Sequence, residues 1–313
     1  MTQHSICILG GTGFVGSHLA TRLVNRGHRV KVLTRHRHRH RELTVLPLLE
    51  LIECDVHNPV ELSLHLQGCD TVINLVGILN EFGGARRFET VHVELPKRVV
   101  EACRDAGVAR LLHMSALNAS TDAPSQYLRS KGAAEDYVHE VGGQFMNVTS
   151  FRPSVIFGPG DGFLNLFAGL LRSIPLALPL ACPGARFAPV YVGDVADAFI
   201  AALDDATLTD KRIDLCGPES FTLRELVAYT ARMIGLKRWI IGLPNWASKL
   251  QARIMGFAPG KPFTLDNYRS MQIDSVCRGG GNCPTALDAV VPHYLGNAAL
   301  DSNRQRNRET VRS

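Results

Sequence analysis

The sequence contains no uninterrupted apolar run long enough to cross a bilayer, which takes about 20 residues. Its first apolar run is short and is not followed by a cleavage site, so we expect no signal peptide. The net charge of +5 is mild and comes largely from two local clusters, so it gives no argument for a nucleic-acid partner. We therefore expect a cytoplasmic protein, and a peripheral contact with the inner membrane stays open as an alternative.

Paired cysteine motifs are also missing. The eight cysteines include no C-x-x-C pair, and Cys277 with Cys283 lacks the second half of a zinc site. Four others lie in or beside expected core elements, where cysteine packs as a small apolar residue: Cys7, Cys54, Cys69 and Cys103. We expect reduced thiols and no bound metal.

The N-terminus does contain a glycine-rich turn between an apolar run and an amphipathic segment. Residues 6–16 read ICILGGTGFVG, with Gly10, Gly13 and Gly16 three positions apart. Gly10 permits a sharp reversal, Gly13 lets a pyrophosphate approach bare backbone, and Gly16 lets the next helix lie against the strand. The first N–H groups of that helix would then face the phosphates. A purely structural turn is the alternative, but the strand–turn–helix context favours a dinucleotide site.

Strands and helices alternate from this turn up to residue 151. We expect strands at 29–33, 49–53, 71–76, 110–114 and 147–151, and helices at 59–66, 88–106 and 125–141. This alternation predicts an α/β fold, a Rossmann-type doubly wound parallel sheet over residues 1–152. After residue 152 prolines break the rhythm, and helices are expected at 195–203, 223–234 and 246–255, with a short strand near Ile213. We assign 153–300 mainly to a smaller C-terminal substrate lobe, let helix 195–203 pack back on the first domain, and expect a disordered basic tail over 301–313.

The acid that a dinucleotide fold normally carries after its second strand is absent, because the first acidic residue of the chain is Glu42. Arg35 stands there instead, and a guanidinium suits a 2′-phosphate. NADP(H) is therefore favoured over NAD(H), with a solvated loop arginine as the alternative. Arg35 opens a run of alternating Arg and His to position 41, for which diffuse attraction, metal capture and an anionic partner stay open. Asp55, after the third strand, either accepts a bond from the adenine amino group or caps the next helix.

Ser115, Tyr127 and Lys131 form a second constellation. Tyr127 and Lys131 are four positions apart, on one face of the expected helix, and Ser115 follows a central parallel strand at the edge where such folds bind ligands. We expect Lys131 to lower the pKa of Tyr127 and to bond the nicotinamide ribose, Tyr127 to move a proton, and Ser115 to hold the substrate oxygen. A surface Tyr–Lys pair is the plain alternative. Gly132, unusual in a helix, costs about 1 kcal/mol against Ala unless close packing requires it.

With these residues, the chain resembles the atypical and extended short-chain dehydrogenases/reductases of the NAD-dependent epimerase/dehydratase type. It is similar, more narrowly, to bacterial relatives of the nucleotide-binding accessory subunit of mitochondrial complex I. The resemblance reaches residue 296 and rests on GGTGFVG at 10–16, LTR at 33–35, NLVG at 74–77, MSAL at 114–117, YLRSK at 127–131, RPSVIFGPGD at 152–161 and PVYVGDVA at 189–196.

The resemblance implies an extended Rossmann fold that binds NADP(H). Beside Gly10, Gly13, Gly16, Arg35, Asp55, Tyr127 and Lys131, the expected cofactor-binding residues are Thr12, Phe14, Val15, Val56, Leu75, Val76, Gly77, Pro153 and Val155. Two functions stay open. The first is an NADPH-dependent oxidoreductase, epimerase or dehydratase acting on an unknown substrate. The second is a non-catalytic nucleotide-binding structural or assembly factor of respiratory complex I or quinone metabolism.

The segment 161–180 is apolar on more than one face. Five side chains follow helical spacing until prolines stop the helix: Phe163, Leu166, Phe167, Leu170 and Leu171. Ordinary core is one interpretation. The other is that one face lines a pocket for an apolar, quinone-like substrate or meets a membrane-associated partner.

Overall fold

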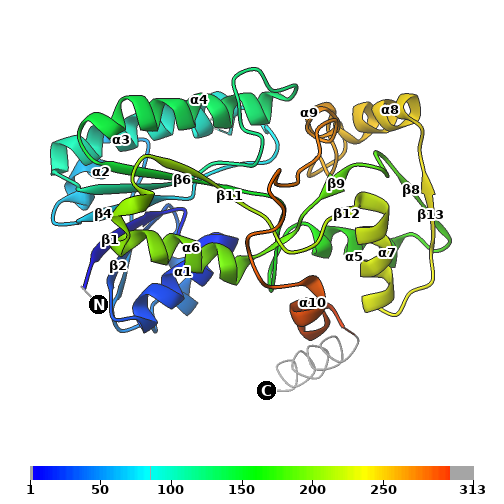
Figure 1. The fold of residues 1–313 in the computed structure, drawn as a ribbon, viewed down its shortest axis with the longest axis horizontal. Helices are drawn as coiled ribbons and strands as arrows, with labels where there is room; N and C mark the ends of the chain where they lie inside the picture. Colours follow the sequence, from blue (N-terminus) through cyan, green and yellow to red (C-terminus); the bar gives the residue numbers. More distant parts are fainter. Residues whose placement is uncertain (1–2, 85, 297–313) are drawn as a thin grey trace. The chain divides into compact units, whose positions relative to one another are not determined.

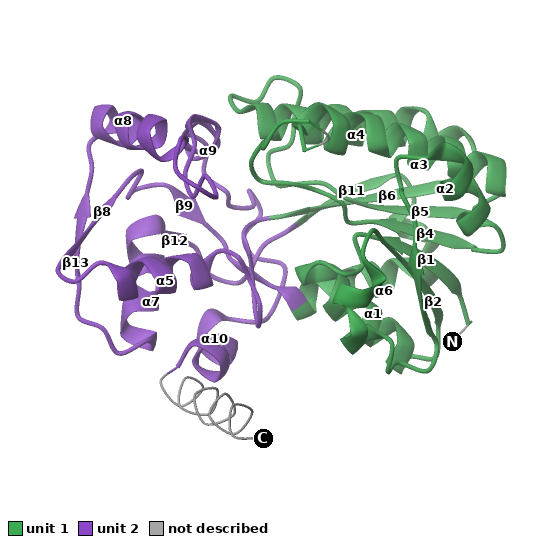
Figure 2. Cartoon of the chain, turned by 180° about the vertical axis from the view of Figure 1, so that it is seen from behind, with its two compact units in different colours: residues 1–153, 193–214 green, residues 154–192, 215–313 purple. Residues whose placement is uncertain are grey.

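The computed structural model describes residues 3–84 and 86–296, so the basic tail expected at 301–313 lies outside the described residues. The chain forms two compact units (Figure 2). Unit 1 comprises Met1–Pro153 and Gly193–Asp214, and unit 2 comprises Ser154–Val192 and Leu215–Ser313.

Unit 1 is built on a seven-stranded sheet in the order β11-β6-β5-β4-β1-β2-β3 (Figure 1). The strands are β1 (Ser5–Leu9), β2 (Arg29–Thr34), β3 (Leu49–Glu53), β4 (Thr71–Asn74), β5 (Arg110–Met114), β6 (Asn147–Pro153) and β11 (Lys211–Leu215). Every pairing from β3 to β6 is parallel. The strand order reverses between β1 and β4, and ligands of such sheets bind at this kind of switch point. The predicted Rossmann-type doubly wound sheet is confirmed.

Helices cover both faces of this sheet (Figure 1). One face carries α2 (Pro59–Leu66), α3 (Leu95–Ala106) and α4 (Gln126–Glu140), and the other carries α1 (Phe14–Asn25) and α6 (Val192–Asp204). The expected helix 88–106 begins with a π-helical segment, Glu89–Glu94, before α3. Short 3₁₀ turns occur at Arg37–Arg39, Arg41–Leu43, Gly142–Gln144 and Ala206–Leu208.

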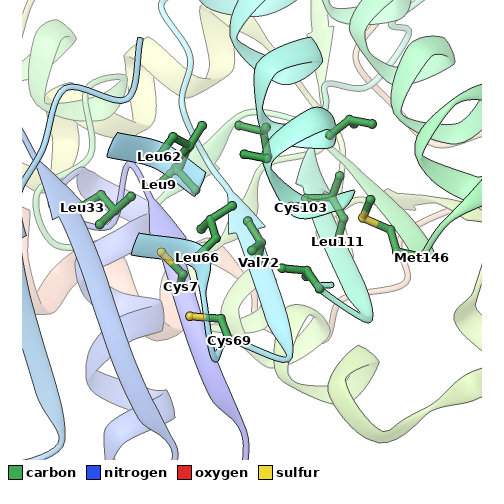
Figure 3. Packing of buried hydrophobic residues seen from close by; sticks show 14 of the residues in the cluster. Cys7, Leu9, Leu33, Leu62, Leu66, Cys69, Val72, Cys103, Leu111 and Met146 are labelled. Carbon is green, nitrogen blue, oxygen red and sulfur yellow. The ribbon is translucent and has the colours of Figure 1, made fainter. Parts of the chain in front are cut away.

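The core between the sheet and α2, α3 and α4 contains four cysteines as well as aliphatic side chains (Figure 3). Cys7, Cys69 and Cys103 pack there with Leu62, Leu66 and Leu111, and Cys54 joins the same cluster. Burial raises the pKa of Cys54 to about 11, which keeps that thiol neutral. The expectation that these four cysteines pack in the core as small side chains is confirmed.

Unit 2 combines three two-stranded sheets with helices. The strands pair as β7 (Ile156–Phe157) with β10 (Val190–Tyr191), β9 (Arg186–Phe187) with β12 (Phe221–Thr222), and β8 (Ala177–Leu180) with β13 (Trp239–Gly242). The helices are α5 (Leu164–Ser173), α7 (Leu223–Met233), α8 (Asn245–Met255), α9 (Leu265–Ser270) and α10 (Leu287–Leu295). α5, α7, α10 and β8 enclose one apolar core.

The apolar stripe of segment 161–180 belongs to this core. Phe167 and Leu171 are buried in it, and Phe163 and Leu170 pack against it. Only Leu166 of the stripe is exposed. Most of the stripe is therefore core of unit 2, as the plainer of the two interpretations expected.

A disulfide joins Cys216 to Cys277, with the two Cα atoms 6.0 Å apart. The expectation of reduced thiols is therefore wrong for this pair. The two cysteines are 61 positions apart in the sequence. The chain after Cys277 also returns to Cys216, since the N–H groups of Asn282 and Cys283 both donate to the Cys216 carbonyl. The other six cysteines form no disulfide within the described residues and are buried.

Candidate functional site

The glycine turn forms a close-packed cradle at the switch point. Gly10 has φ +78°, a conformation that favours glycine, and a Cβ there would lie 3.1 Å from the carbonyl carbon of Leu75. A Cβ at Gly16 would overlap the Gly10 carbonyl oxygen, so the start of α1 can approach the turn only with glycine at this position. Gly10 and Gly16 thus have the structural roles that the sequence predicted.

The N-terminus of α1 is open to an anion. Its N-cap is Gly13, no side chain caps the helix, and the first turn holds no acidic residue. Gly13 is exposed, with Thr12, Phe14 and Val15 partly exposed beside it. A bare helix N-terminus with this charge pattern fits a dinucleotide pyrophosphate.

The segment after β4 lies beside the turn and reaches Lys131. The Leu75 N–H donates to Leu9 at 2.9 Å, and the Val76 N–H donates to the Asn74 side chain at 3.2 Å. A Cβ at Gly77 would stand 3.1 Å from Lys131 Nζ, so glycine leaves room for the ammonium. The structure therefore brings together the Leu75–Gly77 segment and Lys131.

Arg35 follows β2 and is exposed, as are Arg37 and Arg39 of the same run. The run is not extended, since it forms two 3₁₀ turns, Arg37–Arg39 and Arg41–Leu43. The Arg37 N–H donates to the Glu53 carboxylate at 3.1 Å. Among the described residues no group of three His, Cys, Asp or Glu side chains could hold a metal ion.

Asp55 is exposed and accepts a bond from the His57 N–H at 3.0 Å. The cap of α2 is Asn58, whose side chain accepts from Val60 and Glu61. The helix-cap alternative for Asp55 is therefore wrong. Val56 packs on the unit 1 core.

Lys131 is buried and its Nζ donates to the carbonyl oxygen of Met114 at 3.0 Å. Burial lowers the pKa of Lys131 to about 8, although the carboxylate of Glu135 opposes that shift. The same cause acts on Tyr127, where burial raises the pKa to about 12. The expectation that Lys131 lowers the pKa of Tyr127 is wrong here, since removal from water dominates. At neutral pH Tyr127 is a phenol and so a proton donor.

Ser115 takes part in a buried network that the sequence did not reveal. Its Oγ donates to Glu135 at 2.5 Å. The fully buried Glu135 also accepts from Arg152 at 2.8 Å and from Arg212 at 3.0 Å. Because its proton goes to Glu135, Ser115 presents acceptor lone pairs to any third group. The available signal was the four-residue spacing from Tyr127 to Lys131 to Glu135, which places all three on one face of α4.

His92 supports the helical turn that carries Tyr127. The Ile78 N–H donates to His92 Nε2 at 3.0 Å, so Nδ1 carries the proton and donates to Ser130 at 2.9 Å. Ser130 in turn donates to the Tyr127 carbonyl at 2.8 Å. Burial, and then the charge of Lys131, lowers the pKa of His92 to about 2, which keeps this chain of bonds neutral. No spacing in the sequence pointed to His92.

The last two predicted cofactor residues lie where the units divide. Pro153 ends β6, and its carbonyl accepts from the Leu117 N–H at 3.0 Å. Val155 belongs to unit 2, where its carbonyl accepts from Val190 at 2.9 Å.

Comparison with known proteins agrees with this architecture. The family model described as "NAD dependent epimerase/dehydratase family" matches residues 6–216. The chain is 33% identical over 276 residues to the mitochondrial NADH dehydrogenase (ubiquinone) 1 alpha subcomplex subunit 9 of Mus musculus, covering 86% of this chain and 72% of that protein. It is 31% identical over 244 residues to a ceramide reductase of Caulobacter vibrioides, covering 77% and 74%.

Solved structures share the fold at lower identity. The UDP-glucuronic acid 4-epimerase from Bacillus cereus, solved with UDP-glucuronic acid and NAD, aligns with a TM-score of 0.66 and 20% identity, covering 76% of this chain and 86% of that chain. The UDP-glucose 4-epimerase of Thermus thermophilus, solved with NAD, gives 0.63 and 23%, covering 85% and 99%. Together with the family match and the curated relatives, these findings show that the chain belongs to the NAD dependent epimerase/dehydratase family, whose members bind NAD(P).

Proposed function

We propose that this protein binds NADP(H) and reduces the carbonyl group of a small, apolar molecule, with Tyr127 as the proton donor. The observation that carries the proposal is the pair Tyr127 and Lys131 on α4. The Tyr127 phenol stays protonated at neutral pH, and the buried Lys131 lies beside Gly77. A protonated tyrosine suits reduction, because the new alkoxide needs a proton, whereas oxidation of an alcohol would need a phenolate.

The cofactor would be held along the edge of the sheet at the switch point. The pyrophosphate would lie on the N-terminus of α1 beside Gly13, and Arg35 would bond a 2′-phosphate. The Lys131 ammonium would reach the nicotinamide ribose past Gly77. Bound there, the nicotinamide supplies a hydride.

The chain's own residues would complete the reduction. A carbonyl oxygen within reach of the Tyr127 hydroxyl would receive its proton as the carbonyl carbon gains the hydride, which yields an alcohol. Solvent would then return a proton to the phenolate left behind. Glu135 would accept the proton of the Ser115 hydroxyl, so that the lone pairs of Ser115 Oγ stay available to a donor group of the substrate.

A second candidate function is a nucleotide-binding structural or assembly factor of a respiratory complex. Its support is the 33% identity to a mitochondrial protein named as a subunit of NADH dehydrogenase. The bond from Ser115 to Glu135 also favours it, since that bond removes a donor from the substrate oxygen.

Deuterium transfer distinguishes the two. The purified chain would be incubated with NADPH deuterated at C4 and with ketones of lipid and steroid type, alongside nucleotide sugars, and products would be analysed by mass spectrometry. We expect deuterium in one alcohol product. Tyr127→Phe should lower that rate about 100-fold or more and leave NADPH binding unchanged.

Tyr137→Phe, on the same helix, is the matched control and should keep the rate. A Tyr127→Phe variant that transfers deuterium normally would remove Tyr127 from the mechanism. Tight NADPH binding without transfer to any compound, together with co-purification with respiratory membranes, would favour the second candidate.

A further inference from the structure

Helix α8 of unit 2 presents its large apolar side chains outward. Trp246, Leu250 and Ile254 are 73%, 48% and 65% exposed, and Phe257 just beyond the helix is 93% exposed. The three helical residues are four positions apart, so they form one stripe along the helix. We call these four residues the α8 stripe.

The opposite side of α8 packs through small residues. Ser248 and Ala252 are fully buried. Ser248 Oγ donates to the Leu243 carbonyl at 3.2 Å and accepts from the Cys182 N–H at 3.1 Å. The helix is thus anchored by its small residues, and none of the four residues of the α8 stripe is among the buried residues of the unit 2 core. A stripe of this size on a soluble surface usually marks an interaction site.

A second exposed apolar face adjoins the first. Trp239 and Ile241 of β13 are 79% and 52% exposed, while Ile240 between them packs in the core. Pro179 lies opposite Ile241 on β8, and its carbonyl accepts from Gln251 of α8 at 3.1 Å. Figure 1 shows the chain passing from β13 directly into α8. The β13 face and the α8 stripe therefore belong to one structural block.

The charge of this block has a single sign. Residues 236–265 contain no Asp or Glu and five basic side chains, namely Lys237, Arg238, Lys249, Arg253 and Lys261. Arg238 is bonded to the Leu171 and Ile174 carbonyls at the end of α5. Lys249 and Arg253 are exposed and flank the α8 stripe, which gives an apolar ridge with a cationic border.

We propose that the α8 stripe and the β13 face bind the surface of an anionic lipid bilayer, with α8 lying in the plane of the interface. An amphipathic helix with tryptophan on its apolar side and Lys or Arg beside it is the arrangement that such interfaces bind. At 11 residues α8 cannot span a membrane, and no helix within the described residues can. The absence of any acidic residue across 30 positions favours a lipid surface over a protein partner of mixed charge.

The chain carries its own reporters of this contact. Its two tryptophans are Trp239 and Trp246, and both are on the proposed surface. Adding vesicles of phosphatidylcholine mixed with phosphatidylglycerol to the full chain should shift the tryptophan emission to the blue and carry the chain to the top in flotation. Vesicles of phosphatidylcholine alone should bind far less, and added salt should weaken binding to the anionic vesicles.

Variants then assign the binding to this surface. Trp246→Glu with Ile254→Glu should abolish flotation. Lys249→Ala with Arg253→Ala should weaken binding about 25-fold, since each basic residue contributes about fivefold near an anionic surface. Leu64→Glu, at an equally exposed apolar position on α2 of unit 1, is the matched control and should bind as the wild type does.

Three results would overturn the proposal. The first is no binding to anionic vesicles at any salt concentration. The second is an equal loss of binding in Leu64→Glu. The third is concentration-dependent self-association that the α8 variants abolish while vesicle binding is absent, which would assign the surface to a second copy of the chain.

Discussion

At the scale of single residues, Lys131 is a buried lysine to which the proposed function gives a role. Its ammonium is enclosed between the Met114 carbonyl, Gly77 and Glu135. Burial holds its pKa near 8, from an ordinary value of 10.5. The folded chain therefore accommodates the charge at a cost, which is consistent with a group kept for function and not for stability.

The cost of burying the charged form of Lys131 predicts how the free energy of unfolding depends on pH. Between pH 8 and 10.5 the unfolded chain keeps a proton on Lys131 that the folded chain releases, so this residue makes stability rise with pH. Lys131→Met removes that contribution. In urea unfolding, the stability of the variant relative to wild type should fall by about 2 kcal/mol between pH 8 and 9.5, at 1.36 kcal/mol per pKa unit.

Lys97→Met, on the exposed side of α3, is the control and should leave the slope of the wild type intact. If Lys131→Met and wild type show parallel pH profiles, then burial does not lower the pKa of Lys131. The account of the phenol–lysine pair would need revision in that case.

At the scale of elements, two helical glycines have opposite environments. A Cβ at Gly132 of α4 would meet the backbone of Ser120 at 2.5–2.6 Å, whereas a Cβ at Gly169 of α5 would meet no atom within 4 Å. The glycine that looked unfavourable in the sequence thus permits close packing of α4, as anticipated. This close contact between α4 and the Ser120 backbone also fixes the position of the helix that carries Tyr127 and Lys131.

Replacement by alanine should therefore act in opposite directions. Gly169→Ala should stabilise the chain by up to about 1 kcal/mol through helix propensity. Gly132→Ala gains the same propensity but should destabilise the chain, because rigid backbone must move. Denaturant titration measures both, and a stabilised Gly132→Ala variant would show that α4 does not pack as described.

Local patterns predicted the elements of unit 1 closely. The helix 59–66 and the strands 49–53 and 110–114 have the predicted bounds, because apolar alternation and glycine stops are local signals. Unit 2 was less predictable, since its strands of two to four residues are too short to show a period. The sequence also could not predict that this side of α8 is exposed, because the spacing of Trp246, Leu250 and Ile254 is the same for a buried stripe as for an exposed one.

The candidate site, too, was predictable from the sequence only in part. The glycine turn and the Tyr–Lys pair are sequence motifs and were found. The bond from Ser115 to Glu135 and the link from His92 to Ser130 join segments 20 and 38 positions apart, so only the folded chain reveals them. The raised pKa of Tyr127 also depends on burial, which spacing cannot report.

At the scale of the whole molecule, the chain joins a Rossmann-type unit to a second unit that has an exposed apolar surface. The proposed function assigns cofactor chemistry to unit 1, and the lipid contact is assigned to unit 2. The two proposals are separable, because the α8 variants leave every residue of the cofactor cradle in place.

The most direct test of the central claim is a titration of the full chain with NADPH and with NADH, followed by nicotinamide fluorescence. A charge-assisted bond from Arg35 to the 2′-phosphate is worth about 1.5–3 kcal/mol. We therefore predict that NADPH binds about tenfold or more tightly than NADH, that Arg35→Ala removes the preference, and that Arg39→Ala retains it. Equal affinities in the wild type, or an unchanged preference in Arg35→Ala, would contradict the account.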